Sequence, residues 1–183
     1  MSLVSLPPTA ADLAVARAAA RHASTREETT LRVVTWAADE HLVCAAAAAF
    51  WIYGRLLRRD ATLARNADRV LACALVSAIV PHGIKRVVDR KRPNRSVVHW
   101  PRHGIPKSGK PYDSFPSGHA MHIGALASAV AEIVSPAFRP LVWCGATALA
   151  ATRILLLAHY PSDVLAGLGL GVLVNKAVDR LSR

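Results

Sequence analysis

The feature that most constrains the fold is a series of five apolar blocks separated by polar segments. The blocks cover residues 41–57, 68–84, 119–134, 139–159 and 161–177. Their apolar residues are mostly Ala, Leu and Val, with few aromatic residues, which favours helices over strands. A helix needs roughly 20 apolar residues to cross a bilayer, and the blocks approach that length. The pattern predicts an all-α fold, an integral membrane helical bundle of about five transmembrane helices, with an Ala-rich soluble bundle as the alternative.

The segment before the first block has a different pattern. Residues 8–22 are weakly amphipathic, with Arg17 and Arg21 on the polar side. This predicts an N-terminal amphipathic helix, either on the membrane surface or in solvent. We therefore expect an N-terminal segment, residues 1–40, followed by a membrane domain, residues 41–183. No basic stretch leads into a compact apolar run, so we expect no cleaved secretory signal.

The chain of 183 residues carries a formal net charge of +11. Such a charge suits a nucleic acid, an anionic membrane surface or a phosphorylated substrate. The basic residues flank the apolar blocks instead of following one helix, and no nucleic-acid-binding motif is present, so we expect no nucleic-acid partner. Because they fall on both sides of the predicted bundle, they do not decide its orientation. We expect a multi-pass protein of a cell membrane, in particular a bacterial inner membrane.

A polar segment, residues 85–118, separates the second and third blocks, and its start carries two cations. Lys85 and Arg92 are seven residues apart, close to two helical turns, and Pro93 ends the helix. Both side chains are therefore expected to face one point. A basic helix end beside a membrane is common, so this pair alone is a weak signal.

The end of the same segment begins a helix with Ser117, Gly118 and His119. Free N–H groups at a helix start favour an anion, and glycine permits close approach. The Ser117 hydroxyl can add a donor, or it can act only as the N-cap of the helix.

A third polar cluster lies where the fourth block ends. Arg153 is costly inside an apolar block, which suggests an anionic partner or a water-filled cavity. His159 and Asp163 are four residues apart, so the carboxylate can reach one ring nitrogen. That contact would fix the tautomer and make the other nitrogen a better nucleophile.

The number of times that the predicted helices cross the membrane places these three clusters at the same membrane face. The helix from residue 119 leaves one membrane face and the helix from residue 139 returns, so His159 arrives at the face where His119 lies. Lys85 ends its own helix at that face, and Arg153 lies about 9 Å deeper, within reach of a long side chain. The clusters therefore predict a site for a phosphate group at the membrane surface, with a lipid tail in the bilayer.

The three clusters together resemble the signature of the type 2 phosphatidic acid phosphatase (PAP2) superfamily. They are K-x6-RP from Lys85 to Pro93, PSGH from Pro116 to His119, and R-x5-H-x3-D from Arg153 to Asp163, within residues 68–177. Thr152 stands where the family usually has Ser. The resemblance implies that His159 attacks phosphorus, Asp163 orients it, and His119 protonates the leaving oxygen. It also implies that phosphate is held by Lys85, Arg92, Ser117, Gly118 and Arg153.

We therefore expect a membrane lipid phosphatase that hydrolyses a phosphate or pyrophosphate monoester of a lipid, of the polyprenyl pyrophosphate, phosphatidylglycerophosphate or phosphatidic acid type. No cofactor and no metal are expected. His119 and His122 have a spacing that could chelate, but Asp113 is the only carboxylate between residues 90 and 131. The alternatives are a lipid phosphotransferase of the same superfamily and a non-catalytic protein that binds anionic lipids. The sequence does not indicate the substrate, the side of the membrane or the oligomeric state.

Overall fold

A computed structural model describes residues 4–22, 25–58, 60–96 and 111–182 of the chain. The α-helices are α1 (Ala10–His22), α2 (Thr25–Thr35), α3 (Glu40–Ile52), α4 (Ala61–Lys85), α5 (Pro93–Ser96), α6 (Gly118–Ile133), α7 (Arg139–Leu155) and α8 (Pro161–Leu181). Short 3-10 turns, η1 (Trp36–Ala38) and η3 (Pro136–Phe138), precede α3 and α7, and a π-helical turn, η2 (Tyr53–Arg58), extends α3. Two short strands, β1 (Val4–Ser5) and β2 (Val88–Asp89), pair in parallel.

Each predicted apolar block coincides with a helix, so the mostly helical fold is confirmed. The blocks fall on α3 with its π turn, α4, α6, α7 and α8. By length and composition, two described helical stretches can cross a membrane: Glu28–Arg58, with 31 residues, and Ala61–Lys85, with 25 residues. That all five helices cross a membrane stays a prediction.

The segments around the blocks differ from the expectation in two ways. The amphipathic helix near the N-terminus is present as α1, with Arg17 and Arg21 exposed, but a further helix, α2, follows it. The helix that was predicted to carry both Lys85 and Arg92 and to end at Pro93 ends at Lys85 instead, and β2 and α5 follow it within the polar segment 85–118. The N-terminal segment and this polar segment are joined by the β1–β2 pair.

Helix α6 lies at the centre of the bundle and packs closely against α8. Most of its side chains are buried, and it also contacts α4 and α7. Glycines permit the approach: a Cβ added at Gly171 would lie 2.3 Å from the Met121 carbonyl oxygen, and one at Gly124 would lie 2.4 Å from the Leu168 carbonyl oxygen. Gly167 and Gly171 are four residues apart on α8, so both can face α6, and a Cβ at Gly167 would lie 2.5 Å from the Ser117 carbonyl oxygen.

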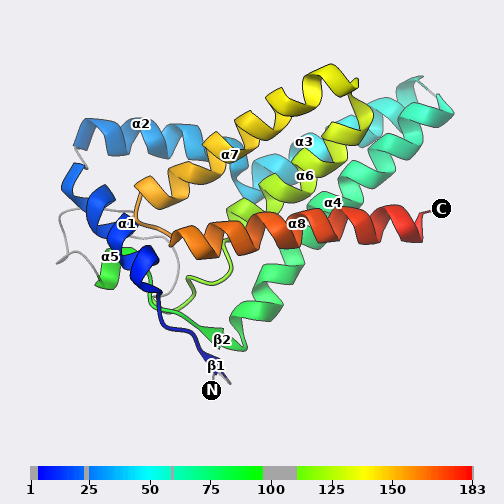
Figure 1. Ribbon diagram of the computed structural model, residues 1–183. Coiled ribbons are helices and arrows are strands. Elements are labelled where there is room, and N and C mark those ends of the chain that lie inside the picture. Colours follow the sequence, from blue (N-terminus) through cyan, green and yellow to red (C-terminus); the bar gives the residue numbers. More distant parts are fainter. Residues whose placement is uncertain (1–3, 23–24, 59, 97–110, 183) are drawn as a thin grey trace.

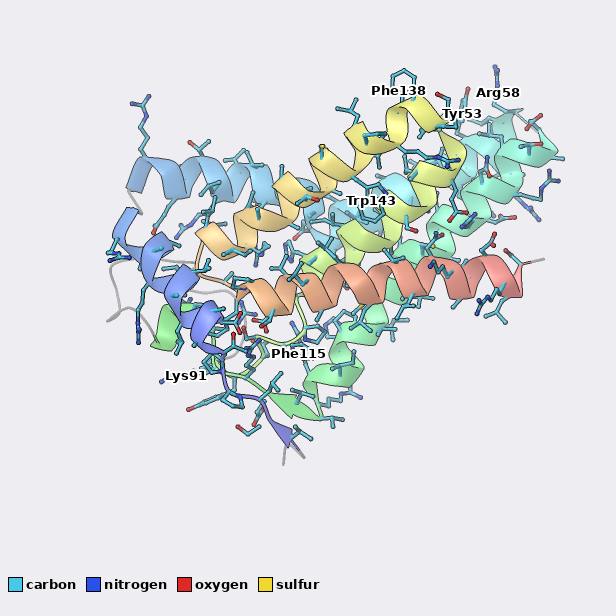
Figure 2. The ribbon with its side chains drawn as sticks, viewed as in Figure 1. Tyr53, Arg58, Lys91, Phe115, Phe138 and Trp143 are labelled. Atoms are coloured by element: carbon cyan, nitrogen blue, oxygen red, sulfur yellow. The ribbon has the colours of Figure 1, made fainter. Side chains whose placement is uncertain are left out.

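The chain reversals bring the ends of four helices to one side of the bundle. Figure 1 shows the last turns of α4 and α7 and the first turns of α6 and α8 on the side where α1, α5 and the strands lie. Phe115 lies on this side, whereas Tyr53, Arg58 and Phe138 lie at the opposite end (Figure 2). The three polar clusters of the sequence therefore lie at the end of the bundle where α1 is found.

Candidate active site

A cavity of about 280 Å³ lies at this end of the bundle. Six of the eight predicted site residues line it: Lys85, Arg92, Gly118, His119, Arg153 and His159. Asp39, Glu40, His41, Pro81, His82, Asp113 and His122 complete the lining. The structure therefore brings the three clusters together, as the crossing argument predicted.

His159 lies in the tight turn between α7 and α8. The turn is held by hydrogen bonds from the N–H groups of Ala158 and His159 to the Arg153 carbonyl, at 3.1 and 3.2 Å, and Leu157 has a positive φ of 52°. The Nδ1 atom of His159 lies 2.7 Å from the Ser114 carbonyl oxygen. Because a carbonyl only accepts, Nδ1 carries the proton and the lone pair is on Nε2.

The surroundings of His159 keep its ring neutral. Its side chain is 2% exposed. Burial, and then the positive charges of Arg92, Arg153 and Lys85, lower its pKa well below the ordinary value. A neutral imidazole with a free Nε2 lone pair is the form that attacks an electrophile.

Asp163 does not make the predicted hydrogen bond to His159. Its Oδ2 atom lies 3.9 Å from Nδ1, beyond hydrogen-bonding distance, and the Ser114 carbonyl occupies the position next to Nδ1. Asp163 instead accepts hydrogen bonds from the Ser114 hydroxyl at 2.5 Å, from the Tyr160 N–H at 2.8 Å and from Arg90. Asp163 is therefore connected to His159 through Ser114, by one hydrogen bond to the serine hydroxyl and one to the serine carbonyl.

The three predicted cations have different partners. Arg92 donates from Nε to Asp113 Oδ1 at 2.9 Å, and the Lys85 Nζ atom lies 4.0 Å from the other oxygen of Asp113. Arg153 donates from Nη1 to the Thr35 hydroxyl at 3.2 Å, while its Nε is buried with no hydrogen-bond partner in the part of the chain that is described. Of the three carboxylates in the cavity wall, Asp113 pairs with Arg92 and Lys85, whereas Arg153 is hydrogen-bonded to a hydroxyl group.

Ser117 is not among the residues that line the cavity. Its side chain is fully buried, and its hydroxyl accepts a hydrogen bond from the Ala120 N–H at 3.3 Å, as the N-cap of α6. Gly118 and His119 follow it into the cavity wall. The N-cap interpretation therefore describes the Ser117 side chain, and contact of Gly118 and His119 with a phosphate stays a prediction.

Histidine and carboxylate side chains are also the usual ligands of a metal ion. Among the described residues, no cluster of three or more His, Cys, Asp or Glu side chains is placed to hold a metal ion. His122, one candidate ligand, is buried, and its Nδ1 lies 2.8 Å from the Ser77 hydroxyl on α4.

The family signature agrees with this geometry. The model of the PAP2 superfamily matches residues 66–181. This chain belongs to the PAP2 superfamily. The match covers most of α4, all of α6, α7 and α8, and every residue of the cavity lining except Asp39, Glu40 and His41.

Two relatives of this chain are named as phosphatases. The chain is 38% identical to a lipid A 1-phosphatase of Rhizobium johnstonii over 100 residues, which are 52% of this chain and 39% of that protein. It is 34% identical to the decaprenylphosphoryl-5-phosphoribose phosphatase of Mycobacterium tuberculosis over 133 residues, 70% of each chain. The chain thus matches about two fifths of the lipid A 1-phosphatase.

Two solved structures have the same fold. The transmembrane PAP2 type phosphatidylglycerolphosphate phosphatase from Bacillus subtilis superposes with a TM-score of 0.69 at 18% identity, over 93% of this chain and 84% of that one. LpxE from Aquifex aeolicus superposes with a TM-score of 0.74 at 14% identity, over 94% of this chain and 96% of that one. These likenesses confirm the PAP2 membrane-phosphatase fold.

Sequence reasoning missed several residues around the PAP2 site. Arg90 is buried between Asp163 and Asp12 of α1, and Ser114 connects Asp163 to His159. Arg90 sits in a run of basic residues, and nothing in its type or spacing separates it from the cations beside it. Asp12 was missed because, in the sequence, it resembles any other polar residue of an amphipathic helix.

Proposed function

We propose that this chain is a membrane-embedded lipid phosphatase that removes a phosphate group through a phosphohistidine intermediate. The observation that carries the proposal is the orientation of His159. Its Nδ1 is bound by the Ser114 carbonyl, so Nε2 is the free nitrogen in a cavity with three cations. A binder of anionic lipids requires the cations but not this histidine.

In the proposed reaction, Nε2 of His159 attacks phosphorus and the bond from phosphorus to the lipid oxygen breaks. His119 donates a proton to that oxygen, which leaves as the lipid alcohol. His119 then accepts a proton from water, the water oxygen attacks the phosphohistidine, and the P–N bond breaks to release inorganic phosphate. Lys85, Arg92 and Arg153 stabilise the negative charge that develops on the phosphoryl oxygens.

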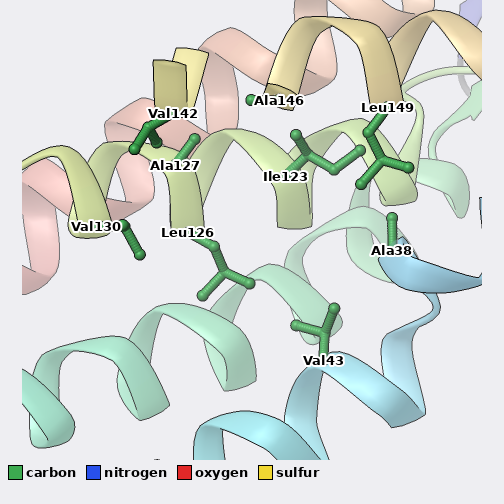
Figure 3. A pocket seen from close by; sticks show the side chains of 9 residues that line it. All are labelled: Ala38, Val43, Ile123, Leu126, Ala127, Val130, Val142, Ala146 and Leu149. Carbon is green, nitrogen blue, oxygen red and sulfur yellow. The ribbon is translucent and has the colours of Figure 1, made fainter. Parts of the chain in front are cut away.

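An apolar groove beside the cavity supports a lipid substrate. It has a volume of about 210 Å³ and lies between α3, α6 and α7 (Figure 3), lined by Ala38, Val43, Ile123, Leu126, Ala127, Val130, Val142, Ala146 and Leu149. Ala38 and Ile123 directly adjoin Asp39 and His122 of the cavity, and Leu149 is one turn before Arg153 on α7. A chain of methylene groups that leaves the phosphate site along these helices would enter this groove.

The carboxylates of the cavity favour one kind of headgroup. Asp39 and Glu40 line the cavity together with the cations. They would repel a second phosphate and would accept hydrogen bonds from hydroxyl groups. We therefore propose a single phosphate on a hydroxyl-bearing sugar or glycerol headgroup, in preference to a pyrophosphate. The phosphoribose in the name of the mycobacterial relative is a headgroup of this chemistry.

The test uses purified protein in detergent with four substrates: a phosphorylated sugar lipid, phosphatidylglycerophosphate, phosphatidic acid and a polyprenyl pyrophosphate. Release of inorganic phosphate is expected, fastest with the first two. Transfer of phosphate to an added lipid alcohol, with no free phosphate, would indicate the phosphotransferase instead. Binding without turnover of any substrate would contradict the proposal.

The two histidines are then separated with a ³²P-labelled p-nitrophenyl ester, whose leaving group needs little protonation. His119→Ala is expected to accumulate acid-labile phosphohistidine, because it keeps the nucleophile and loses a proton donor worth about 10²- to 10⁴-fold. His159→Ala is expected to trap none. Label in His159→Ala and none in His119→Ala would reverse the two roles.

A further inference from the structure

Helix α1 makes a buried ionic contact with the site, although it lies outside the family match. Arg90 donates from Nη2 to Asp12 Oδ2 at 2.7 Å and from Nη1 to Asp163 Oδ1. The three side chains are each at most 2% exposed. One guanidinium thus joins two carboxylates that are 151 positions apart in the sequence.

Asp12 also binds the beginning of α8. Its Oδ1 accepts from the Ser162 N–H at 3.1 Å, and its Oδ2 accepts from the Ser162 hydroxyl at 2.7 Å. Burial alone would raise the pKa of Asp12, but hydrogen bonds from Ser162 and Thr9 outweigh it and lower the pKa to about 2. The carboxylate is therefore ionised at neutral pH and completes the charge balance around Arg90.

From Arg90 the contacts continue to the nucleophile. Asp163 accepts from the Ser114 hydroxyl at 2.5 Å, and the Ser114 carbonyl accepts from His159 Nδ1 at 2.7 Å. Apolar packing fixes the same region, because Ala16 of α1 forms a buried cluster with Leu157 and Tyr160 of the turn that carries His159. Arg90 lies over the Tyr160 ring, 4.9 Å from its centre.

We propose that Asp12 and Arg90 are positioning residues for the attack by His159, and that α1 is therefore part of the catalytic apparatus. This inference rests on the proposed phosphatase reaction. If Asp12 loses its charge, Arg90 is paired with Asp163 alone, and both the beginning of α8 and Asp163 lose a constraint. A small displacement of Asp163 is transmitted through Ser114 to the direction of the Nε2 lone pair. Attack geometry changes, whereas the cations that bind the phosphate do not.

The test compares Asp12→Asn with Asp68→Asn in the full chain. Asn keeps the size of Asp12 and removes its charge. Asp68 is the matched control, because it pairs with Arg55 at 2.7 Å in an exposed contact outside the site. For Asp12→Asn, kcat is expected to fall about 10- to 100-fold, as for partners that orient a reacting group, with KM within about twofold. Asp68→Asn is expected to match the parent chain.

A binding measurement accompanies the kinetics. Orthovanadate resembles the transition state of phosphoryl transfer, and inorganic phosphate resembles the ground state. For Asp12→Asn, calorimetry is expected to show a loss of vanadate affinity similar to the loss in kcat, with phosphate affinity unchanged. If the parent chain turns over none of the lipids, the proposed function fails, while the vanadate comparison still decides the positioning role.

A double-variant cycle tests whether Asp12 affects kcat through Arg90. Because Asp12 acts through Arg90, adding Asp12→Asn to Arg90→Gln is expected to reduce kcat by less than twofold beyond Arg90→Gln alone. Ser162→Ala, which removes one hydroxyl and no charge, is the second variant if Asp12→Asn does not fold; it is expected to lower kcat more than KM. Unchanged kcat and vanadate affinity in the folded variants, or independent multiplicative losses in the cycle, would overturn the proposal.

Discussion

Replacing Gly171 with alanine tests whether the contact between α6 and α8 sets the geometry of the site. The added Cβ would lie 2.3 Å from the Met121 carbonyl oxygen and 2.5 Å from the Ala125 nitrogen, both backbone atoms of α6. Backbone atoms of a buried helix cannot rotate away as a side chain can. The two helices must therefore separate locally.

The distances give the size of the effect. Ordinary contact with a Cβ begins at 3.4 Å, so the helices must move apart by about 1 Å. Such overpacking destabilises a fold by about 1–3 kcal/mol. Met121 is two residues after His119 on α6, whereas His159 precedes α8, so the separation moves one histidine relative to the other. A misplacement of about 1 Å can lower a rate by about 10²-fold, and we expect a loss of this size in kcat.

Gly169 provides the control on the same helix. A Cβ at Gly169 would meet nothing within 4 Å, so Gly169→Ala is expected to keep full activity and to stabilise the helix by about 0.4–1 kcal/mol. Thermal unfolding in detergent and phosphate release measure the two effects. Wild-type kcat in Gly171→Ala, with its melting temperature lowered, would refute the argument that this contact aligns the histidines.

Three further results are expected. Phosphate release survives excess EDTA, because the cations neutralise the substrate, and a loss that only Mg²⁺ or Zn²⁺ restores would contradict this. Arg153→Ala removes most activity with the melting temperature kept, because Arg153 is a buried charge whose Nε has no partner among the described residues; full activity would assign it a purely structural role. Asp12 has a pKa of about 2, below its ordinary value of 3.8, so its stabilisation is complete above pH 3.8 and is lost as the pH falls toward 2. Asp12→Asn therefore flattens the pH dependence of unfolding in that window, and an unchanged slope would mean that Asp12 does not contribute.

The helices and the cations could be predicted from the sequence because their signals are local. An apolar block of helix length marks α6 and α8 within a few residues, whereas α4 begins seven residues before its block and ends at Lys85, not at Pro93. The direction of each crossing then places Lys85, Arg153 and His159 at one end of the bundle. Helix α2 lacks this signal, because it is polar and rich in β-branched residues, and its contacts with α7 support it.

The contacts within the site could not be predicted because several depend on backbone atoms. The partner of His159 is the Ser114 carbonyl, and any residue type at that position would offer the same group. The spacing of His159 and Asp163 correctly suggested proximity but not which atoms meet. Whether Ser117 faces the substrate or caps the helix depends on one side-chain rotation, which the sequence does not record.

The two partners of Arg90 also have a consequence for biosynthesis. A chain made from its N-terminus completes Asp12 and Arg90 well before Asp163, which follows α7. Asp12 can therefore neutralise Arg90 while the last helical hairpin is still being made, when the second carboxylate does not yet exist. His159 and Asp163 arrive together with that hairpin. The reactive histidine is thus made only after Lys85, Arg92, Ser114 and Arg153, and a truncated chain that lacks α8 would keep a neutralised arginine and His159 but not Asp163.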